Sequence, residues 1–190
     1  MATSRWFFEP GHTSAEFRAR HMMVTYVRGH LKNVHGFLDV DPDDPEHARV
    51  EATIDATQVY TGQAQRDAHL RSPDFFDVEH HPTWTFTGTR IRQLSPMEFA
   101  LTGDLTVRGV TQPVTLDTSY LGQWDTPWWE EGRNLGTRRR AGFSARTRIN
   151  RLDFGVSWND VVDRGGVVVS DMVDVIIDVE AVREAVTSAA

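Results

Sequence analysis

Apolar and polar residues alternate with a period of two in eight separate segments of this chain, and this pattern restricts the fold more than any other feature. In 50–56, for example, Val50, Ala52 and Ile54 alternate with acidic and hydroxyl residues. Such alternation is typical of β-strands that turn one face to the core and the other to solvent. The segments are 13–21, 34–40, 50–56, 83–89, 99–107, 114–120, 143–149 and 167–179.

Turn-rich stretches such as 41–45 and 164–166 separate these segments, so consecutive strands can pair as antiparallel neighbours. A sheet of eight strands loses its exposed edges when it closes, and its interior then suits side chains or one slender ligand. We therefore predict one all-β domain over 1–190, an eight-stranded antiparallel barrel with one or two short helices. One helix is expected at 63–70, and 21–27 is expected to form a short helix or a turn. A long loop is expected at 124–140, packed on itself or, alternatively, capping the barrel or forming a contact surface.

The composition argues against several functional classes. The net charge of −7 disfavours binding to nucleic acid and attraction to an anionic membrane surface. The absence of cysteine excludes disulfides, thiolate zinc sites and cysteine nucleophiles. No apolar run approaches the length of a membrane span, and the first ten residues contain no signal-peptide core. We therefore expect no nucleic-acid partner, no stable membrane insertion and a cytoplasmic location.

The segment 66–82, RDAHLRSPDFFDVEHHP, follows neither a strand period nor a helical period over its whole length. It combines two arginines, three histidines and four acidic residues with the adjacent Phe75 and Phe76. This mixture predicts a structured connection that presents charge at one end and aromatic bulk at the other.

The same segment resembles, almost residue for residue, the characteristic motif of the YceI-like family. Further blocks that resemble the family follow in the expected order: 9–17, His21, 27–29, Pro82, Phe86, 103–111, 149–155 and 170–173. Departures include Glu9 and the extra Thr13 in the first block, Met172 in the last and the tryptophan-rich stretch 124–140. The resemblance implies a lipocalin-like barrel that binds polyisoprenoids or similar long amphiphiles.

Under this interpretation the inward apolar faces bind the ligand, and each buried methylene contributes about 0.8 kcal/mol before association costs. A dry, filled core is the alternative reading of the same residues. We expect no cofactor other than the bound isoprenoid or other lipid. The candidate tunnel residues are Phe17, Met22, Phe37, Phe75, Phe76, Trp84, Phe86, Leu101, Leu105, Phe143 and Val173.

Charged residues near the motif are candidates for the tunnel mouth or for structural ion pairs. Arg66, His69 and Arg71 could receive a ligand head group, since arginine suits a pyrophosphate. A buried network that fixes the segment is the alternative, and we favour it for Arg66 and Asp67. Asp171 falls on the apolar face of the last predicted strand and needs a partner, for which Arg151 is the first choice.

Two other functions stay open at this point. His69 and Asp67 could serve a prenyl- or acyl-ester hydrolase, although no nucleophile elbow is present. A filled barrel could act purely as an interaction or stress protein. We expect no metal site, because the adjacent His80 and His81 would point apart on an extended segment. The expected partner is a long apolar small molecule, with a homodimer as one alternative for the assembly.

Overall fold

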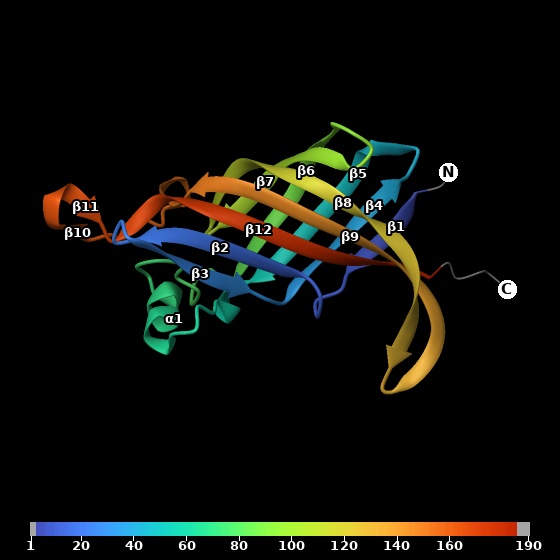
Figure 1. Cartoon of the computed structure of the whole chain (residues 1–190), viewed down its shortest axis with the longest axis horizontal. Coiled ribbons are helices and arrows are strands. Elements are labelled where there is room, and N and C mark those ends of the chain that lie inside the picture. Colours follow the sequence, from blue (N-terminus) through green and yellow to red (C-terminus); the bar gives the residue numbers. More distant parts are fainter. Residues whose placement is uncertain (1–2, 186–190) are drawn as a thin grey trace.

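The computed structural model describes residues 3–185, so the predicted domain limits at 1–2 and 186–190 lie outside it. The main sheet has the strand order β1-β4-β5-β6-β7-β8-β9-β12-β2-β3, and β1 also pairs with β12, which closes a barrel (Figure 1). Its strands are β1 (Ser4–Phe8), β2 (Ser14–His21), β3 (Thr25–Leu31), β4 (Val34–Asp41), β5 (Asp44–Asp55), β6 (Thr83–Gln93), β7 (Glu98–Val107), β8 (Val110–Glu130), β9 (Arg133–Asn150) and β12 (Val169–Arg183). Outside it lie the helix α1 (Ala64–Arg71), the 3-10 turns η1 (Ala56–Gln58), η2 (Arg151–Phe154) and η3 (Asp163–Gly165), and the short strands β10 (Val161–Val162) and β11 (Gly166–Val167).

The barrel has eight strands because its first two are each interrupted once. β1 and β2 both pair with β12, one after the other, and together form the first barrel strand. β3 and β4 pair with β2 and β1 respectively and together form the second. With β5, β6, β7, β8, β9 and β12 this gives the predicted eight-stranded antiparallel barrel, which is confirmed.

One predicted helix is present, and at 21–27 the chain forms the turn that is the alternative to a helix there. Helix α1 occupies the position predicted at 63–70. In place of a helix, the chain makes a tight turn at 22–24 and enters β3. Met22 and Met23 both adopt positive φ, which a helix does not allow. The pairing of β2 with β3 outweighs the weak local helical signal.

The barrel wall opens on one side, where β3 separates from β5. The last pair that joins β4 to β5 is Val34 with Ile54, and β3 lies beyond it. Residues 56–82 fill this opening, and their Tyr60 exchanges two backbone hydrogen bonds with His30, of 2.8 and 3.0 Å. Figure 1 shows α1 beside β3 at this end of the barrel. The segment singled out in the sequence is therefore part of the wall.

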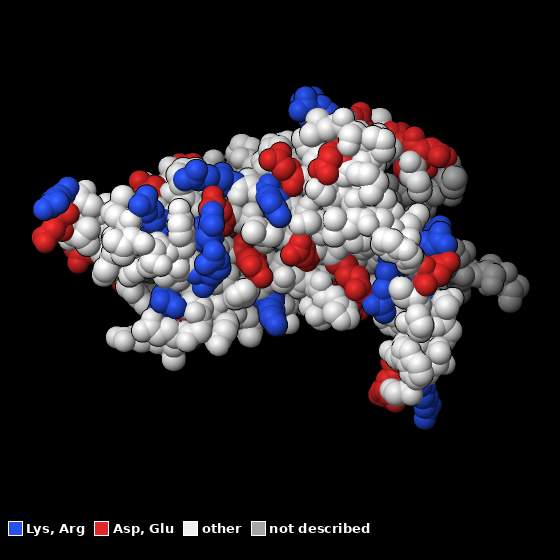
Figure 2. Space-filling model, viewed as in Figure 1, with Lys and Arg blue, Asp and Glu red and all other residues white. Residues whose placement is uncertain are grey.

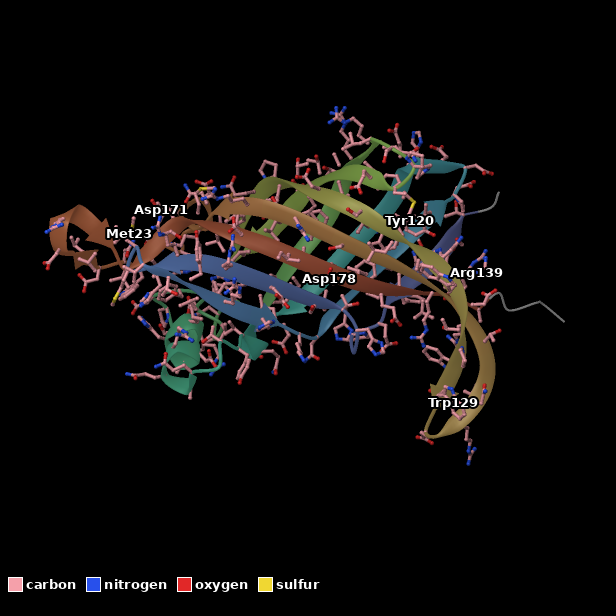
Figure 3. All side chains as sticks on the ribbon, in the orientation of Figure 1. Met23, Tyr120, Trp129, Arg139, Asp171 and Asp178 are labelled. Atoms are coloured by element: carbon pink, nitrogen blue, oxygen red, sulfur yellow. The ribbon has the colours of Figure 1, made fainter. Side chains whose placement is uncertain are left out.

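The loop predicted at 124–140 is wrong, because β8 and β9 continue through it as a two-stranded arm that projects beyond the barrel (Figure 1). The strands reverse at Glu131 and Gly132, both at positive φ. Trp128 lies between two guanidiniums, 4.4 Å from that of Arg138 and 5.2 Å from that of Arg140. Cross-strand stacking of this kind stabilises an extended ribbon. Figure 3 shows Trp129 near the tip of the arm.

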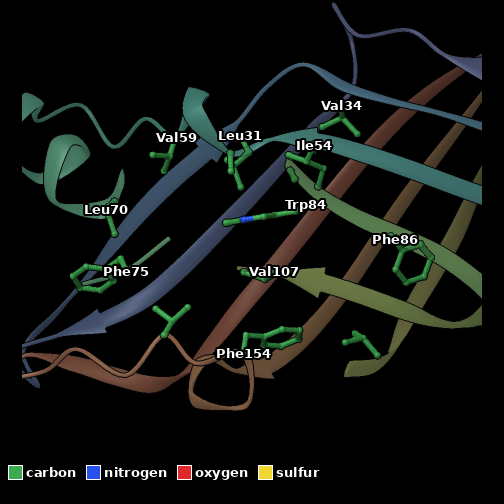
Figure 4. Close-up of a cluster of buried hydrophobic side chains, with 14 of the residues drawn as sticks. Leu31, Val34, Ile54, Val59, Leu70, Phe75, Trp84, Phe86, Val107 and Phe154 are labelled. Atoms are coloured by element: carbon green, nitrogen blue, oxygen red, sulfur yellow. The ribbon is translucent and has the colours of Figure 1, made fainter. Parts of the chain in front are cut away.

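Two separate clusters of apolar side chains lie inside the barrel. The larger occupies the end that carries α1 and contains the side chains shown in Figure 4, among them Leu31, Trp84 and Phe154. The smaller one is centred on Trp6, with Ala141, Ala181 and the partly buried Phe8, Leu38, Val40, Tyr120, Phe143 and Val179. Apolar packing thus concentrates in two places along the barrel.

Three phenylalanine rings lie flat against the wall, each over a glycine of the neighbouring strand. A Cβ atom added to Gly29 would lie 2.2 Å from the Phe17 ring, and one added to Gly103 would lie 2.4 Å from the Phe86 ring. Gly36 stands in the same relation to Phe8, at 2.6 Å. Because each glycine leaves room beneath a ring, the rings extend less far into the interior.

We expect Gly29→Ala to lower the free energy of unfolding by about 1–3 kcal/mol, since the new methyl group displaces the Phe17 ring. Adding Phe17→Leu, which removes the clashing ring atoms, should recover most of that loss in a denaturant titration. Gly11→Ala is the control, because its nearest neighbour is a Glu9 side-chain oxygen at 3.5 Å. A double variant as unstable as the sum of its single changes would contradict the ring-over-glycine packing.

Candidate functional site

The segment 66–82 places its apolar residues against the larger cluster. Leu70 and Phe75 are buried there, and Phe76 and Val78 are partly buried against the same side chains. The Phe76 ring meets the Trp84 ring edge to face, with centroids 4.7 Å apart. The apolar residues of this charged segment therefore line one end of the barrel interior.

The polar residues of the segment hold the chain that precedes it. The buried Asp67 carboxylate accepts hydrogen bonds from the backbone N–H and the hydroxyl of Thr61, of 2.8 and 2.5 Å. Arg66 donates to the hydroxyl and the backbone carbonyl of Thr61, and Arg71 donates to the Val59 carbonyl at 3.1 Å. Among residues 3–185 Asp67 has no ion-pair partner, so its predicted ion pair is replaced by hydrogen bonds to a loop.

The geometry does not assemble the hydrolase constellation considered from the sequence. His69 Nε2 lies 2.9 Å from an oxygen of Asp74, whereas Asp67 is engaged with Thr61. The Ser72 hydroxyl donates to the His69 backbone carbonyl at 2.7 Å, not to its ring. The imidazole instead contacts Phe75 and Trp158 edge to face, with centroids 5.0 and 4.8 Å away. His69 therefore acts as a packing residue at the rim of the larger cluster.

Arg151 is the most deeply buried basic residue of the described chain, with 6% of its surface exposed. It donates to the carbonyls of Val156, Trp158 and Ser170 at 2.6, 2.9 and 3.0 Å, and to that of Val169 at 3.3 Å. Burial lowers the pKa of its guanidinium, against the opposing effect of the Asp171 carboxylate. Arg151 thus ties η2 and the chain after it to the start of β12.

The structure brings Arg151 and Asp171 together, with nitrogen and oxygen 3.6 Å apart. Asp171, however, does not lie on the apolar face of the strand. A register irregularity between Val169 and Val173 turns it outward, and 54% of its side chain is exposed (Figure 3). Backbone carbonyls, more than the carboxylate, therefore satisfy the buried guanidinium.

Most of the predicted tunnel residues face the barrel interior, and two do not. The inward set on the strands is Phe17, Trp84, Phe86, Leu101, Leu105, Phe143 and Val173, and the motif adds Phe75 and Phe76. Phe37 lies on the outer face, covered by the guanidiniums of Arg5 and Arg49 at 4.4 and 5.3 Å. It alternates with the inward Leu38, so the strand period decides its face. Met22 is 46% exposed in the turn between β2 and β3.

Two residues of this site had no role in the sequence interpretation. Arg108 donates to the carbonyls of Phe75 and Gly155, at 3.1 and 2.9 Å, and so joins the motif to the chain after η2. Trp158 packs on Phe75, with ring centroids 5.2 Å apart. The adjacent Arg108 and Gly109 mark the turn, but nothing in the sequence indicates where the long arginine reaches.

Beyond Phe76 the motif ends in an ion pair between the exposed His80 and the largely buried Asp77, and this pair should respond to pH. His80 Nδ1 lies 2.9 Å from an Asp77 oxygen, and this hydrogen bond raises the pKa of His80 while it lowers the pKa of Asp77. The pair stabilises the fold when His80 is protonated and loses that contribution as the pH rises through the raised pKa. We expect an NMR titration midpoint of His80 above 6.5, and a return toward 6.5 in Asp77→Asn. An unchanged midpoint in that variant would contradict the pairing.

The outer face of the barrel is charged and of mixed sign. Across β3, β2, β12 and β9 a row of paired positions reads Arg28, Arg18, Asp174, Arg148. Figure 2 shows basic and acidic side chains interspersed over this face. Among residues 3–185 no three acidic or histidine side chains are grouped to hold a metal ion. No helix within those residues has the length and apolarity needed to cross a membrane.

Comparisons with known proteins place this architecture. The YceI-like domain pattern matches residues 6–181. Protein YceI of Escherichia coli O157:H7 is 38% identical over 176 residues, which cover 93% of this chain and 84% of that protein. The crystal structure of a Campylobacter jejuni YceI protein has 28% identity and a TM-score of 0.71, covering 87% of this chain and 90% of that one.

A more distant structure has the same fold. A polyisoprenoid binding domain from Saccharophagus degradans has a TM-score of 0.67 at 13% identity, covering 95% of this chain and 99% of that one. The closed eight-stranded barrel is thus the lipocalin-like fold of these proteins. From the matched pattern and the identity to YceI, this chain belongs to the YceI-like family.

Proposed function

We propose that the barrel interior holds one long apolar molecule, a polyisoprenoid or a similar amphiphile, and that the protein carries or sequesters it without chemical change. The observation that carries this proposal is the incomplete burial of the inner wall. On β12 the inward Val173, Val175, Ile177 and Val179 are all half-buried, although they point away from the outer solvent. Inward residues of β7 and β9 share this property, namely Phe99, Leu101, Leu105, Phe143, Thr147 and Ile149.

A filled barrel core would bury such side chains almost completely, because protein interiors pack as densely as organic crystals. The rings that lie flat over Gly29, Gly36 and Gly103 also leave space inside the barrel, because they make its lining thinner. A hydrocarbon chain that contacts this wall gains about 0.8 kcal/mol for each buried methylene. One isoprene unit therefore contributes roughly 4 kcal/mol before the costs of association.

The comparisons support the same ligand class. The Saccharophagus degradans domain is named for polyisoprenoid binding, and this chain shares its fold. His69 contacts Asp74 and Asp67 contacts Thr61, so these two residues do not contact each other as a hydrolase would require, which favours binding without turnover. The Arg66 and Arg71 guanidiniums donate to the backbone carbonyls of Thr61 and Val59, in the chain that precedes the motif. We therefore assign no head-group recognition to these two arginines, and we place most of the selectivity in the shape and length of the apolar chain.

Uptake of diphenylhexatriene, a rod-shaped hydrocarbon that fluoresces in apolar surroundings, tests the proposal. Delipidated protein should bind about one equivalent, and geranylgeraniol should displace it competitively. A filled-barrel interaction protein would give neither saturable uptake nor displacement. Release of a hydrolysed product from geranylgeranyl acetate, beyond one equivalent of protein, would instead support an enzyme.

A further inference from the structure

The indole N–H of Trp84 is a buried hydrogen-bond donor inside the barrel. Trp84 is inward on β6 and 9% exposed, and its indole Nε1–H finds no acceptor among residues 3–185. Trp6, in the smaller cluster, is buried to a similar degree at 5%, yet its Nε1 donates to the Ser4 hydroxyl at 3.0 Å. Buried tryptophans usually satisfy this N–H, as Trp6 does and Trp84 does not.

The surroundings of Trp84 offer it only apolar contacts. Ile54 lies opposite it on β5, and the Phe76 ring packs against it edge to face. Figure 4 shows the indole extending from β6 into the space between Leu31, Phe75 and Val107. A phenylalanine would fill an apolar site of this kind without the cost of an unsatisfied donor. A molecule inside the barrel that carries an acceptor would satisfy this N–H.

The chemistry of the site restricts that acceptor. A water molecule needs two to four polar partners, whereas the side chains of Ile54, Phe76, Leu31, Phe75 and Val107 around Trp84 are all apolar (Figure 4). A hydroxyl group would accept from Trp84 but would carry a donor of its own into the apolar cluster. A carbonyl oxygen accepts and donates nothing, so it matches a site that consists of one N–H in apolar surroundings.

We propose that Trp84 Nε1–H donates to a carbonyl oxygen on the buried part of the ligand. This inference rests on the proposed function and specifies it further. The preferred ligand is a long apolar molecule with an acceptor oxygen inside the barrel, as in a terpenoid ketone or ester. A plain hydrocarbon of the same shape binds less tightly, because it leaves the N–H unsatisfied.

Two ligands that differ in a single group test the proposal. Hexahydrofarnesylacetone is a branched ketone, and norpristane is the hydrocarbon in which a methylene replaces its carbonyl. In displacement of diphenylhexatriene, the wild-type protein should prefer the ketone by about tenfold, the value of one hydrogen bond made in apolar surroundings. Trp84→Phe keeps an aromatic ring and removes the N–H. It should abolish this preference and leave the affinity for norpristane within about twofold.

A direct readout comes from the indole resonances of protein labelled with ¹⁵N-tryptophan. The Trp84 N–H signal, assigned by its loss in Trp84→Phe, should move downfield with the ketone and stay with the hydrocarbon. The Trp6 signal is the internal control, since its N–H already has a partner. Equal affinity of the wild type for the ketone and the hydrocarbon would overturn the inference. A Trp84→Phe protein that loses the same amount of affinity for each of them would also overturn it. Failure of both ligands to bind the wild type would overturn the proposed function itself.

Discussion

Replacing Arg151 by methionine should lower the free energy of unfolding by about 3–5 kcal/mol, the usual cost of leaving buried polar partners uncompensated. Methionine fills much of the same volume, so the loss comes from the hydrogen bonds. The carbonyls of Val156, Trp158 and Ser170 lose the guanidinium donor together, whereas that of Val169 keeps the Asn159 side-chain amide at 2.8 Å. They belong to the chain after η2 and to the start of β12, which the guanidinium holds together.

A urea titration followed by circular dichroism measures this effect. Arg148→Met is the matched control, because Arg148 lies nearby on β9 with 66% of its side chain exposed and pairs with Asp174 at 3.5 Å. We expect the control to change stability by about 1 kcal/mol or less, as surface ion pairs do. Asp171→Asn should also have a small effect, since that carboxylate is mostly exposed. Equal effects of Arg151→Met and Arg148→Met would contradict the structural role of Arg151.

Replacing Val175 by phenylalanine should weaken ligand binding by at least about tenfold and change the free energy of unfolding by less than about 1 kcal/mol. Val175 is inward and half-buried, in register with Phe17 and Thr147. A larger side chain there occupies space that we assign to the ligand. In a filled core the same substitution would cost about 1–3 kcal/mol of stability, because overpacking strains the neighbours.

Diphenylhexatriene titrations and thermal unfolding of the same preparation distinguish a ligand space beside Val175 from a filled core. Ile176→Phe is the control, since Ile176 is the next residue on β12, points outward and is 36% exposed. It should leave both binding and stability close to the wild type. A Val175→Phe protein that is strongly destabilised, or that binds normally, would contradict a ligand space beside β12.

Alternation was sufficient to predict the barrel, because a period of two fixes both the strand and the face that it turns inward. It missed β1, where Arg5, Trp6 and Phe7 show no clean alternation, and β3, where charges and Gly29 interrupt it. These two short strands are held by their neighbours and not by their own pattern. The arm at 124–140 was missed for a related reason, since Trp128 and its arginines stabilise each other only across the two strands.

The motif was recognisable in the sequence, whereas its contacts were not. The apolar role of Phe75 and Phe76 follows from their bulk. The partners of Arg66 and Asp67, by contrast, depend on how the chain folds back at Thr61. The same holds for Asp171, which one bulge turns from the core to the surface. Only a three-dimensional structure reveals that the Trp84 N–H is unsatisfied, because this depends on the side chains around the ring.

The most direct test of a ligand-holding interior is mass spectrometry of the purified protein, first in its native state and then after organic extraction. We expect a complex that carries close to one equivalent of a long apolar molecule, which is lost on extraction and restored when the molecule is added back. In Val175→Phe the bound fraction should fall sharply. Native protein that carries no such molecule, and that takes none up after extraction, would contradict the proposal that this barrel is built around a ligand.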